Sequence, residues 1–203
     1  DKPSYYQKIY ETHRPFVEHA ARHRTQYYGE VTLIDDCVGR ILKTLDELRL
    51  RENTIVVFTS DHGDMLGDHF LFYKGSYHYP QCASVPLIVH WTGRVAREKV
   101  VDGIVQEIDL MPTILDLAGC PAPPGVQGRS QKAVLTTNST DTGYSSALVE
   151  YGISGVSLPG AQAFDGGIPD LWTLRTREWR LSYYPKLETS ELYDLSEDPN
   201  EFV

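Results

Sequence analysis

The chain has 203 residues, a length that suits one α/β domain or one domain with a small appendage. Its hydrophobic fraction of 41% and charged fraction of 23% are those of an ordinary globular protein. The 19 basic and 28 acidic residues give a net charge of −9, so we expect no nucleic-acid partner, which would require a concentrated basic face. The sequence has no run of about 18 or more apolar residues, so we expect no membrane-spanning helix and no membrane partner.

The N-terminal part of the chain predicts helices. Residues 1–26 lack a long apolar period, and we expect an N-terminal arm with a short helix there. Residues 27–50 predict the clearest helix, because their apolar side chains recur at alternating spacings of three and four residues and so form one stripe. The stripe consists of Val31, Ile34, Val38, Ile41, Leu45 and Leu48.

Three segments in the middle of the chain have the composition of strands. Residues 55–59 and 85–91 are runs of β-branched, aliphatic and aromatic residues, which are typical of strands buried on both faces. Residues 100–108 predict a third strand, which leads into a helix over 109–119. Because the connections between these elements are short, we expect an α/β fold with parallel strands.

The C-terminal part predicts a small antiparallel sheet. Residues 121–169 are rich in Pro, Gly, Ser and Thr and indicate loops, apart from a strand-like segment at 147–151. Residues 171–176 and 179–184 predict a hairpin, and residues 191–195 predict a further strand. The sequence therefore divides into an N-terminal arm (1–26), an α/β part (27–128), and a linker with a small C-terminal antiparallel subdomain (129–203).

The most informative segment directly follows the first predicted strand. Ligands in open α/β sheets bind beyond the carboxyl ends of the strands, so Asp61 and His62 stand where a site is expected. A carboxylate and an imidazole can supply half of a divalent cation site, provided that the chain turns there, which Gly63 permits. The alternative interpretation is a polar turn in which Asp61 caps the next segment.

Lys74 and His78 follow in the next loop segment and are candidate catalytic residues. A lysine beside a metal ion can hold an anionic oxygen and stabilise a leaving group. His78 can serve beside it as a hydrogen-bond donor or as an acid. The alternative for both residues is an ordinary position on the surface.

Five motifs occur in an order that is typical of one family. They are residues 59–69 (TSDHGDMLGDH), 73–75 (YKG), 85–89 (VPLIV), 109–115 (DLMPTIL), and the closing ELYDL of 191–195 with DPNE at 198–201. Together they resemble the C-terminal half of the sulfatase family in the alkaline phosphatase superfamily, and they are similar to arylsulfatases and phosphonate monoester hydrolases. This resemblance implies the C-terminal portion of an alkaline phosphatase-like fold, with a mixed or parallel sheet sandwiched by helices and a small antiparallel C-terminal sheet.

The resemblance also implies a chemistry. Members of the family hydrolyse sulfuric esters and close relatives hydrolyse phosphonate or phosphate esters, so the implied substrate is a small sulfated or phosphonate ester. By the same resemblance, Asp61 and His62 are metal ligands, and Lys74 contacts the sulfate group and the leaving oxygen. Many members carry Asn where His62 stands and bind calcium, and a nitrogen ligand shifts the expectation toward manganese without excluding calcium.

The sequence departs from the family pattern in two places. The family's nucleophile is a formylglycine made from Cys or Ser in a [CS]-x-P-x-R motif, and these 203 residues contain no such motif. We expect the motif upstream of Asp1, and we therefore expect the 203 residues alone to hydrolyse nothing. Ser84 stands where an arginine commonly precedes Val-Pro.

Three functions stay open at this point. The first is the C-terminal portion of a metal-dependent sulfatase-type hydrolase, and the second is a phosphonate or phosphate ester hydrolase of the same superfamily. The third is a non-catalytic interaction domain that has kept the shape of the family. A strand edge left without a neighbour would also favour association with a second copy of the chain. The sequence leaves the cellular compartment open between the cytoplasm and the periplasm or exterior.

Overall fold

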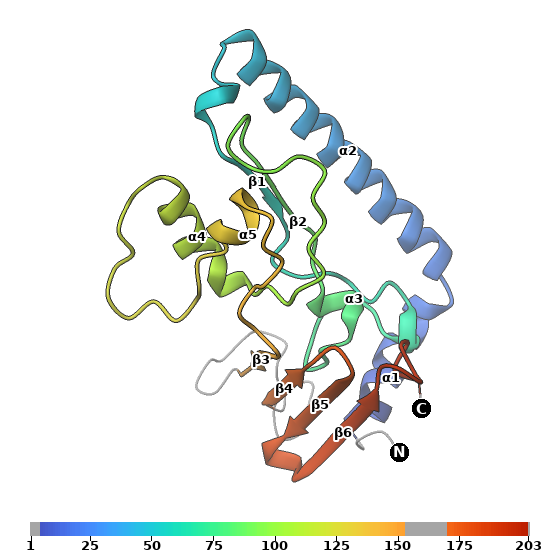
Figure 1. Cartoon of the computed structure of the whole chain (residues 1–203). Coiled ribbons are helices and arrows are strands. Elements are labelled where there is room, and N and C mark those ends of the chain that lie inside the picture. The colour runs from blue at the N-terminus through green and yellow to red at the C-terminus, as the bar shows by residue number, and fades with distance from the viewer. Residues whose placement is uncertain (1–4, 153–169, 203) are drawn as a thin grey trace. The chain divides into compact units, whose positions relative to one another are not determined.

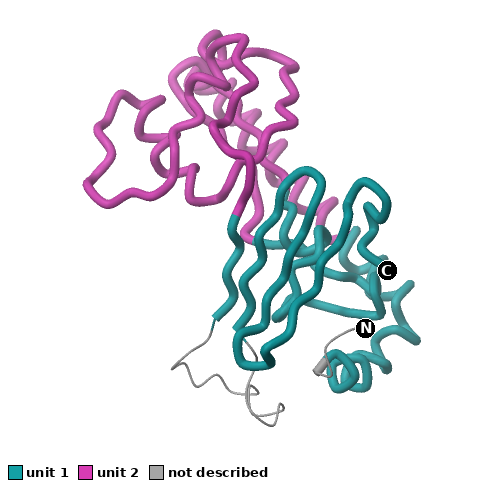
Figure 2. Tube along the Cα trace, turned by 60° about the horizontal axis from the view of Figure 1, so that its bottom comes forward, with its two compact units in different colours: residues 1–28, 62–85, 148–203 teal, residues 29–61, 86–147 magenta. Residues whose placement is uncertain are grey.

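A computed structural model describes residues 5–152 and 170–202 of the chain (Figure 1). These residues form two compact units, and each unit is assembled from separate stretches of the chain (Figure 2). The first unit is drawn from Asp1–Tyr28, His62–Val85 and Leu148–Val203, and the second from Gly29–Asp61 and Pro86–Ala147. Within the described ranges, no helix is both long enough and apolar enough to cross a membrane.

Two helices form the N-terminal part of the chain. Helix α1 spans Tyr5–Val17, and helix α2 spans Ala20–Glu47. The helix predicted over residues 27–50 is confirmed, although it begins seven residues earlier, inside the predicted arm. None of the residues of α2 is buried, and Ile34 and Ile41 on its apolar stripe are 50% and 60% exposed. The periodicity therefore predicts the helix correctly, but the described residues do not cover its apolar side.

The second unit contains a pair of strands, β1 (Val56–Thr59) and β2 (Leu87–His90). The two strands are antiparallel, with Val56 opposite His90, so the expected parallel arrangement is wrong for this pair. A run of β-branched residues favours extended backbone but does not determine the direction of pairing. The expected burial on both faces is also wrong, because Phe58 is 37% exposed and Ile88 is 58% exposed.

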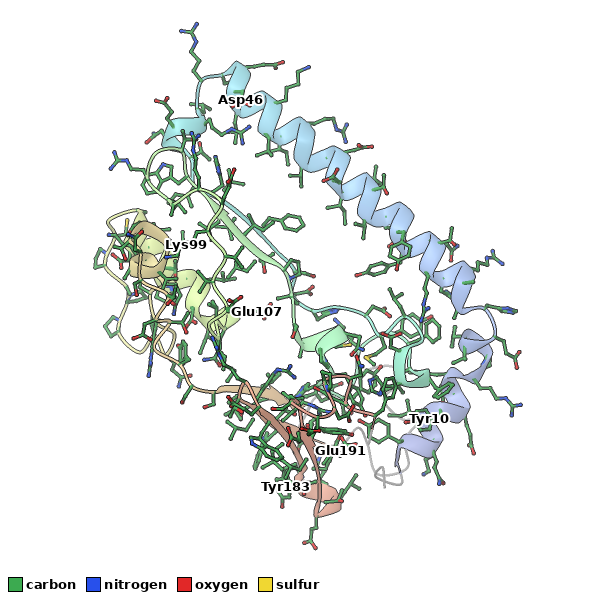
Figure 3. All side chains as sticks on the ribbon, turned by 45° about the vertical axis from the view of Figure 1, so that its right-hand side comes forward. Tyr10, Asp46, Lys99, Glu107, Tyr183 and Glu191 are labelled. Atoms are coloured by element: carbon green, nitrogen blue, oxygen red, sulfur yellow. The ribbon has the colours of Figure 1, made fainter. Side chains whose placement is uncertain are left out.

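The rest of the second unit is made of short helices and loops. The segment predicted as a third strand, residues 100–108, is not a strand, and its end forms part of a 3-10 turn, Glu107–Asp109. Helix α4 (Leu110–Leu117) follows as expected, and helix α5 (Lys132–Thr136) was not predicted. The Lys99 ammonium (labelled in Figure 3) holds the end of α5. It donates to the backbone oxygens of Val134, Thr137 and Ser139 at 2.6, 2.8 and 2.5 Å.

The first unit is built on a four-stranded sheet in the order β3-β4-β5-β6. Strand β4 pairs antiparallel with β5, and β5 pairs antiparallel with β6, so the small antiparallel C-terminal sheet is confirmed. The alternating burial along β5 shows that one face of the sheet is covered and the other is exposed. The strands are β3 (Ala147–Tyr151), β4 (Leu171–Arg175), β5 (Trp179–Tyr184) and β6 (Thr189–Asp194).

The hydrophobic core of the first unit joins three distant parts of the sequence. Helix α1 contributes Tyr6 and the sheet contributes Leu171 and Tyr184, all at most 1% exposed. The Tyr6 and Tyr184 hydroxyls lie 3.2 Å apart, and Tyr184 donates to the Glu191 carboxylate at 2.9 Å. The remaining core side chains are Ile9 of α1 and five from the segment that carries the candidate site, namely Met65, Leu71, Tyr77, Tyr79 and Cys82. The core therefore fixes the path of that loop.

Candidate functional site

The loop that begins at His62 is held by its own backbone and by one carboxylate. The Met65 amide donates to the carbonyl of Tyr73 at 3.1 Å, which closes the loop. The Asp64 Oδ1 atom accepts from the amides of Leu66 at 2.8 Å and Tyr73 at 3.0 Å. Asp64 thus ties the start of the loop to its end. Helix α2 adds a further tie, because Arg24 pairs with Asp68 at 3.1 Å.

Gly63 allows two backbone segments to approach closely. Its amide donates to the Cys82 carbonyl at 2.9 Å. A Cβ atom at position 63 would lie 1.9 Å from the Gln81 carbonyl oxygen, a distance that the backbone cannot accommodate. The sequence analysis assigned Gly63 to a turn, whereas the structure gives a different reason for glycine at this position, which is the lack of space for a side chain. Any other residue would displace His62 from its place beside this contact.

The structure brings His62 and Lys74 into contact. The Nδ1 atom of His62 lies 2.8 Å from the Gly63 carbonyl oxygen, which can only accept, so Nδ1 carries a proton. The Nε2 atom contacts the Nζ atom of Lys74, whose ammonium can only donate. The imidazole therefore presents an Nε2 lone pair toward the side on which Lys74 lies. Lys74 itself is exposed.

Asp61 and His62 fit part of a metal site. A histidine ligand commonly binds metal through one ring nitrogen while the other donates to a carbonyl, and the contact with Gly63 supplies that second bond. Asp61 lies two residues beyond the end of β1 and is exposed. Among the described residues, no group of three or more His, Cys, Asp or Glu side chains is placed to hold an ion. The carboxylate of Asp61 and the imidazole of His62 are donor types that could bind calcium or manganese, each of which requires further ligands.

His78 is buried against strand β4 of the sheet, with 9% of its surface exposed. Its Nδ1 atom lies 2.9 Å from the Thr173 hydroxyl oxygen on β4. Burial, and then the positive charge of Arg180, lower the pKa of His78 to about 4, so the ring is neutral at pH 7. A neutral imidazole can donate a hydrogen bond, whereas an acid with so low a pKa would already have lost its proton.

A buried ion pair that the sequence analysis did not identify lies beneath the site loop. Arg180 on β5 and Glu201 near the C-terminus are 1% and 0% exposed, and they pair at 2.8 Å. The guanidinium of Arg180 lies between the rings of Tyr79 and Tyr193, 4.8 and 4.5 Å from their centroids. Arg175 pairs with the second oxygen of Glu201 at 2.9 Å. The only signal for this cluster was Glu201 in the closing D-P-x-E motif, to which no role was assigned.

Cys82 packs under the same loop. Its Sγ atom lies 3.5 Å from the carbonyl oxygen of Tyr73 and is part of the core. Burial, followed by the negative charge of Asp64, raises the pKa of the Cys82 thiol to about 12. The thiol is therefore protonated and unreactive at pH 7.

Family models match nearly the whole chain. Residues 1–120 match the model of the sulfatase family, and residues 67–203 match the model described as N-sulphoglucosamine sulphohydrolase, C-terminal. The chain is 33% identical over 186 residues to an arylsulfatase of Clostridium perfringens, which covers 90% of the chain and 35% of that protein. It is 33% identical over 183 residues to arylsulfatase K of Rattus norvegicus, which covers 89% of the chain and 31% of that protein.

Solved structures give the same result. One of them, described as a complex with its substrate D-glucosamine-2-N,6-O-disulfate, superposes with a TM-score of 0.72 at 28% identity, covering 84% of this chain and 33% of that one. A phosphonate monoester hydrolase from Silicibacter pomeroyi gives 0.68 at 29% identity, covering 80% and 33%. The chain spans about a third of the length of the relatives that it matches. This chain belongs to the sulfatase family of the alkaline phosphatase superfamily.

Proposed function

We propose that this chain is the C-terminal portion of a metal-dependent hydrolase of sulfuric esters. The observation that carries the proposal is the contact between the Lys74 ammonium and the Nε2 atom of His62, the residue that we propose as a metal ligand. Membership of the sulfatase family supports the reaction class. The relatives whose names include a sulfated sugar or an arylsulfatase activity support a small sulfated ester as substrate.

In this proposal, Asp61 and His62 supply two ligands to a divalent cation, calcium or manganese. When bound, the cation offsets negative charge on the oxygens of the ester group. Because one lone pair cannot serve two partners, His62 Nε2 is unable to accept from Lys74 and ligate the cation at once. With a cation held by His62, the Lys74 ammonium would be available to the ester.

Lys74 then acts on the leaving group. Its ammonium donates a hydrogen bond to the ester oxygen as the bond from that oxygen to sulfur breaks, and it offsets the negative charge that develops there. The long exposed side chain of Lys74 can make this move without disturbing the core. The nucleophile that attacks sulfur, which the family resemblance gives as a formylglycine, has no matching motif in these 203 residues.

The test is a kinetic comparison on the full-length gene product. We expect turnover of an aryl sulfate that requires calcium or manganese, and a loss of about 10²–10³ in kcat for Lys74→Ala. Lys43→Ala, which removes an exposed lysine from α2, is the matched control and should retain the activity of the wild type. Equal kcat values for Lys74→Ala and the wild type would refute the assignment of Lys74.

The 203-residue chain alone gives a second test. We expect it to hydrolyse no aryl sulfate, because the nucleophile is missing. We expect Mn²⁺ to broaden the NMR signals of the His62 ring through paramagnetic relaxation, and Asp61→Asn to weaken this effect. Saturable hydrolysis by the chain that Lys74→Ala abolishes would contradict the upstream nucleophile, and His62 signals unaffected by Mn²⁺ would contradict the metal ligands.

A phosphonate or phosphate ester hydrolase of the same superfamily is the second candidate. It is favoured by the similarity to a phosphonate monoester hydrolase and to a multifunctional alkaline phosphatase superfamily protein of Trinickia caryophylli, 40% identical over 108 residues. Assays of an aryl sulfate and an aryl phosphonate at equal concentration separate the two candidates by their kcat/KM values. A gene product that hydrolyses neither, and that lacks a [CS]-x-P-x-R motif, would instead be a non-catalytic domain.

A further inference from the structure

A continuous chain of side-chain hydrogen bonds leads from the buried arginine to His78. Arg180 Nη1 donates to the Ser182 hydroxyl at 2.6 Å, and the Ser182 and Thr173 hydroxyl oxygens lie 2.7 Å apart. Thr173 in turn lies 2.9 Å from Nδ1 of His78. The chain crosses directly from β5 to β4, because Ser182 and Thr173 are opposite each other in the register of the two strands. Arg180, Ser182 and Thr173 are each at most 1% exposed, so water does not compete for these bonds.

The direction of every bond in this chain follows from its first member. A guanidinium can only donate, so the Ser182 oxygen accepts from Arg180. The proton of Ser182 then has Thr173 as its partner, and the proton of Thr173 has His78 Nδ1 as its partner. The reverse order would leave the Ser182 proton buried without an acceptor, which is costly. His78 is therefore an acceptor at Nδ1, and its proton lies on Nε2.

We propose that Thr173 and Ser182 are positioning residues that hold His78 as a neutral Nε2–H donor to an anionic oxygen of the ester. Within the described part of the chain, the bond to Thr173 is the hydrogen bond of His78, so the Nε2–H of a side chain that is nine-tenths buried has no protein acceptor. His78 follows Lys74 by four residues in the same loop segment, and both belong to the first unit. The fixed tautomer matters because an Nδ1–H ring would turn a lone pair toward the anion and repel it.

This inference rests on the proposed function only for the identity of the anion. The tautomer itself is tested on the 203-residue chain labelled with ¹⁵N, by long-range proton–nitrogen correlation of the His78 ring, with His78→Gln used to assign the signals. We expect Nε2 protonated and Nδ1 unprotonated at pH 7. Protonation of Nδ1 in the wild type would overturn the proposal. Thr173→Val should produce a mixture of tautomers, and Thr173→Ser, which keeps the hydroxyl, should restore the Nε2–H form.

Kinetics of the full-length gene product test the consequence. A donor that improves the binding of charge in the transition state should affect kcat more than KM, so we expect Thr173→Val to lower kcat about 10-fold with KM little changed. Thr173→Ser should recover the wild-type value, and near-UV circular dichroism confirms that both variants are folded. A kcat of Thr173→Val equal to that of the wild type overturns the inference and leaves the proposed function intact. A wild type that hydrolyses no ester refutes the proposed function. The tautomer of His78 still tests whether Thr173 and Ser182 position its ring.

Discussion

The two units differ in what they do with their apolar side chains. The first unit buries aromatic and aliphatic residues from α1, the site loop and the C-terminal sheet in one core. In the described part of the second unit, Leu117 and Val134 are the buried hydrophobic residues of its helices. Both units also expose apolar residues. In the first unit these lie on the open face of the sheet, such as Trp179 at 45% exposed, and in the second unit on the stripe of α2 and on β1 and β2, such as Ile41 at 60% and Ile88 at 58%.

This difference teaches what an apolar pattern does and does not specify. The stripe on α2 marks the side on which a covering layer would fit, but the described residues of the second unit do not provide that layer. The first unit covers part of its apolar surface with α1 and the site loop, and it also buries polar groups that are hydrogen-bonded. Glu191, labelled in Figure 3, is one example, because it accepts from Tyr184 at 2.9 Å and from Tyr193 at 3.2 Å.

The largest difference in stability should appear when one partner of an ion pair is removed in each unit. Glu201→Gln removes the ion-pair partner of the buried Arg180, so we expect a loss of about 3–5 kcal/mol in the free energy of unfolding. Glu47→Gln on α2 removes the exposed partner of Lys43 and should cause no measurable change. Urea unfolding followed by near-UV circular dichroism measures both. If the two variants unfold at the same urea concentration, the buried pair contributes nothing special to the first unit.

Truncation of aliphatic side chains should show a slightly smaller contrast. Leu171 is 0% exposed, and Leu171→Ala should cost about 2–4 kcal/mol because it opens a cavity in the core. Ile41→Ala, at a position 60% exposed, should cost less than about 0.5 kcal/mol. The same denaturation experiment measures the two values. A loss at Ile41 as large as that at Leu171 would mean that the α2 stripe is covered in solution, for example by a second copy of the chain.

The pH dependence of stability should depend on His78 in the first unit. The folded pKa of His78 is about 4, below the ordinary value of 6.5, because of burial and of Arg180, the charge that faces it. Between these values the unfolded state binds more protons, so the free energy of unfolding rises as the pH increases from 4 to 6.5 and is then level. The gain from this residue is at most roughly 3 kcal/mol.

His78→Gln should remove this part of the pH dependence, whereas His90→Gln on the exposed strand β2 should keep it. The measurement is the free energy of unfolding of each variant at pH 4.5 and pH 7. If His78→Gln and the wild type differ by the same amount at both pH values, His78 does not titrate between them and its depressed pKa is refuted.

The smallest effect should follow a charge placed on the open side of α2. Ile34 is 50% exposed, so Ile34→Lys should change the free energy of unfolding by less than about 0.5 kcal/mol. Sedimentation analysis of the variant and the wild type adds a sharper readout. A change from dimer to monomer with unchanged stability would show that the stripe is a contact between copies, and a large loss of stability would show that it belongs to a folded core.

The sequence predicted individual helices and strands well, and it predicted how they pair less well. The hairpin of β4 and β5 was predicted from two strand-like segments separated by a short turn, and the register pairs Arg175 with Arg180 across that turn. The direction of β1 and β2 did not follow, because residue composition favours extended backbone in either direction. Helix α5 was missed because its five residues are too few for a helical period to be visible.

In the candidate site, too, the sequence identified residues that are near one another in the chain and missed the contacts between distant segments. The sequence identified His62 and Lys74, which the structure places in contact, and this pairing depends on a loop of fewer than 15 residues. The chain from Arg180 to His78 could not be predicted, because Thr173 and His78 are 95 residues apart and no pattern links them. Likewise, the partner of Glu201 is specified only by the packing of the sheet.

The buried thiol of Cys82 can report how often the site loop opens. The carbonyl of Cys82 receives the Gly63 amide, and its sulfur packs against the loop, so an alkylating reagent reaches it only when the loop separates from α3 (Pro80–Ala83). Cys120 is exposed and reacts without such an opening, which gives an internal reference in the same molecule. The ratio of the two alkylation rates therefore reports the fraction of time for which the loop carrying His62 and Lys74 is open.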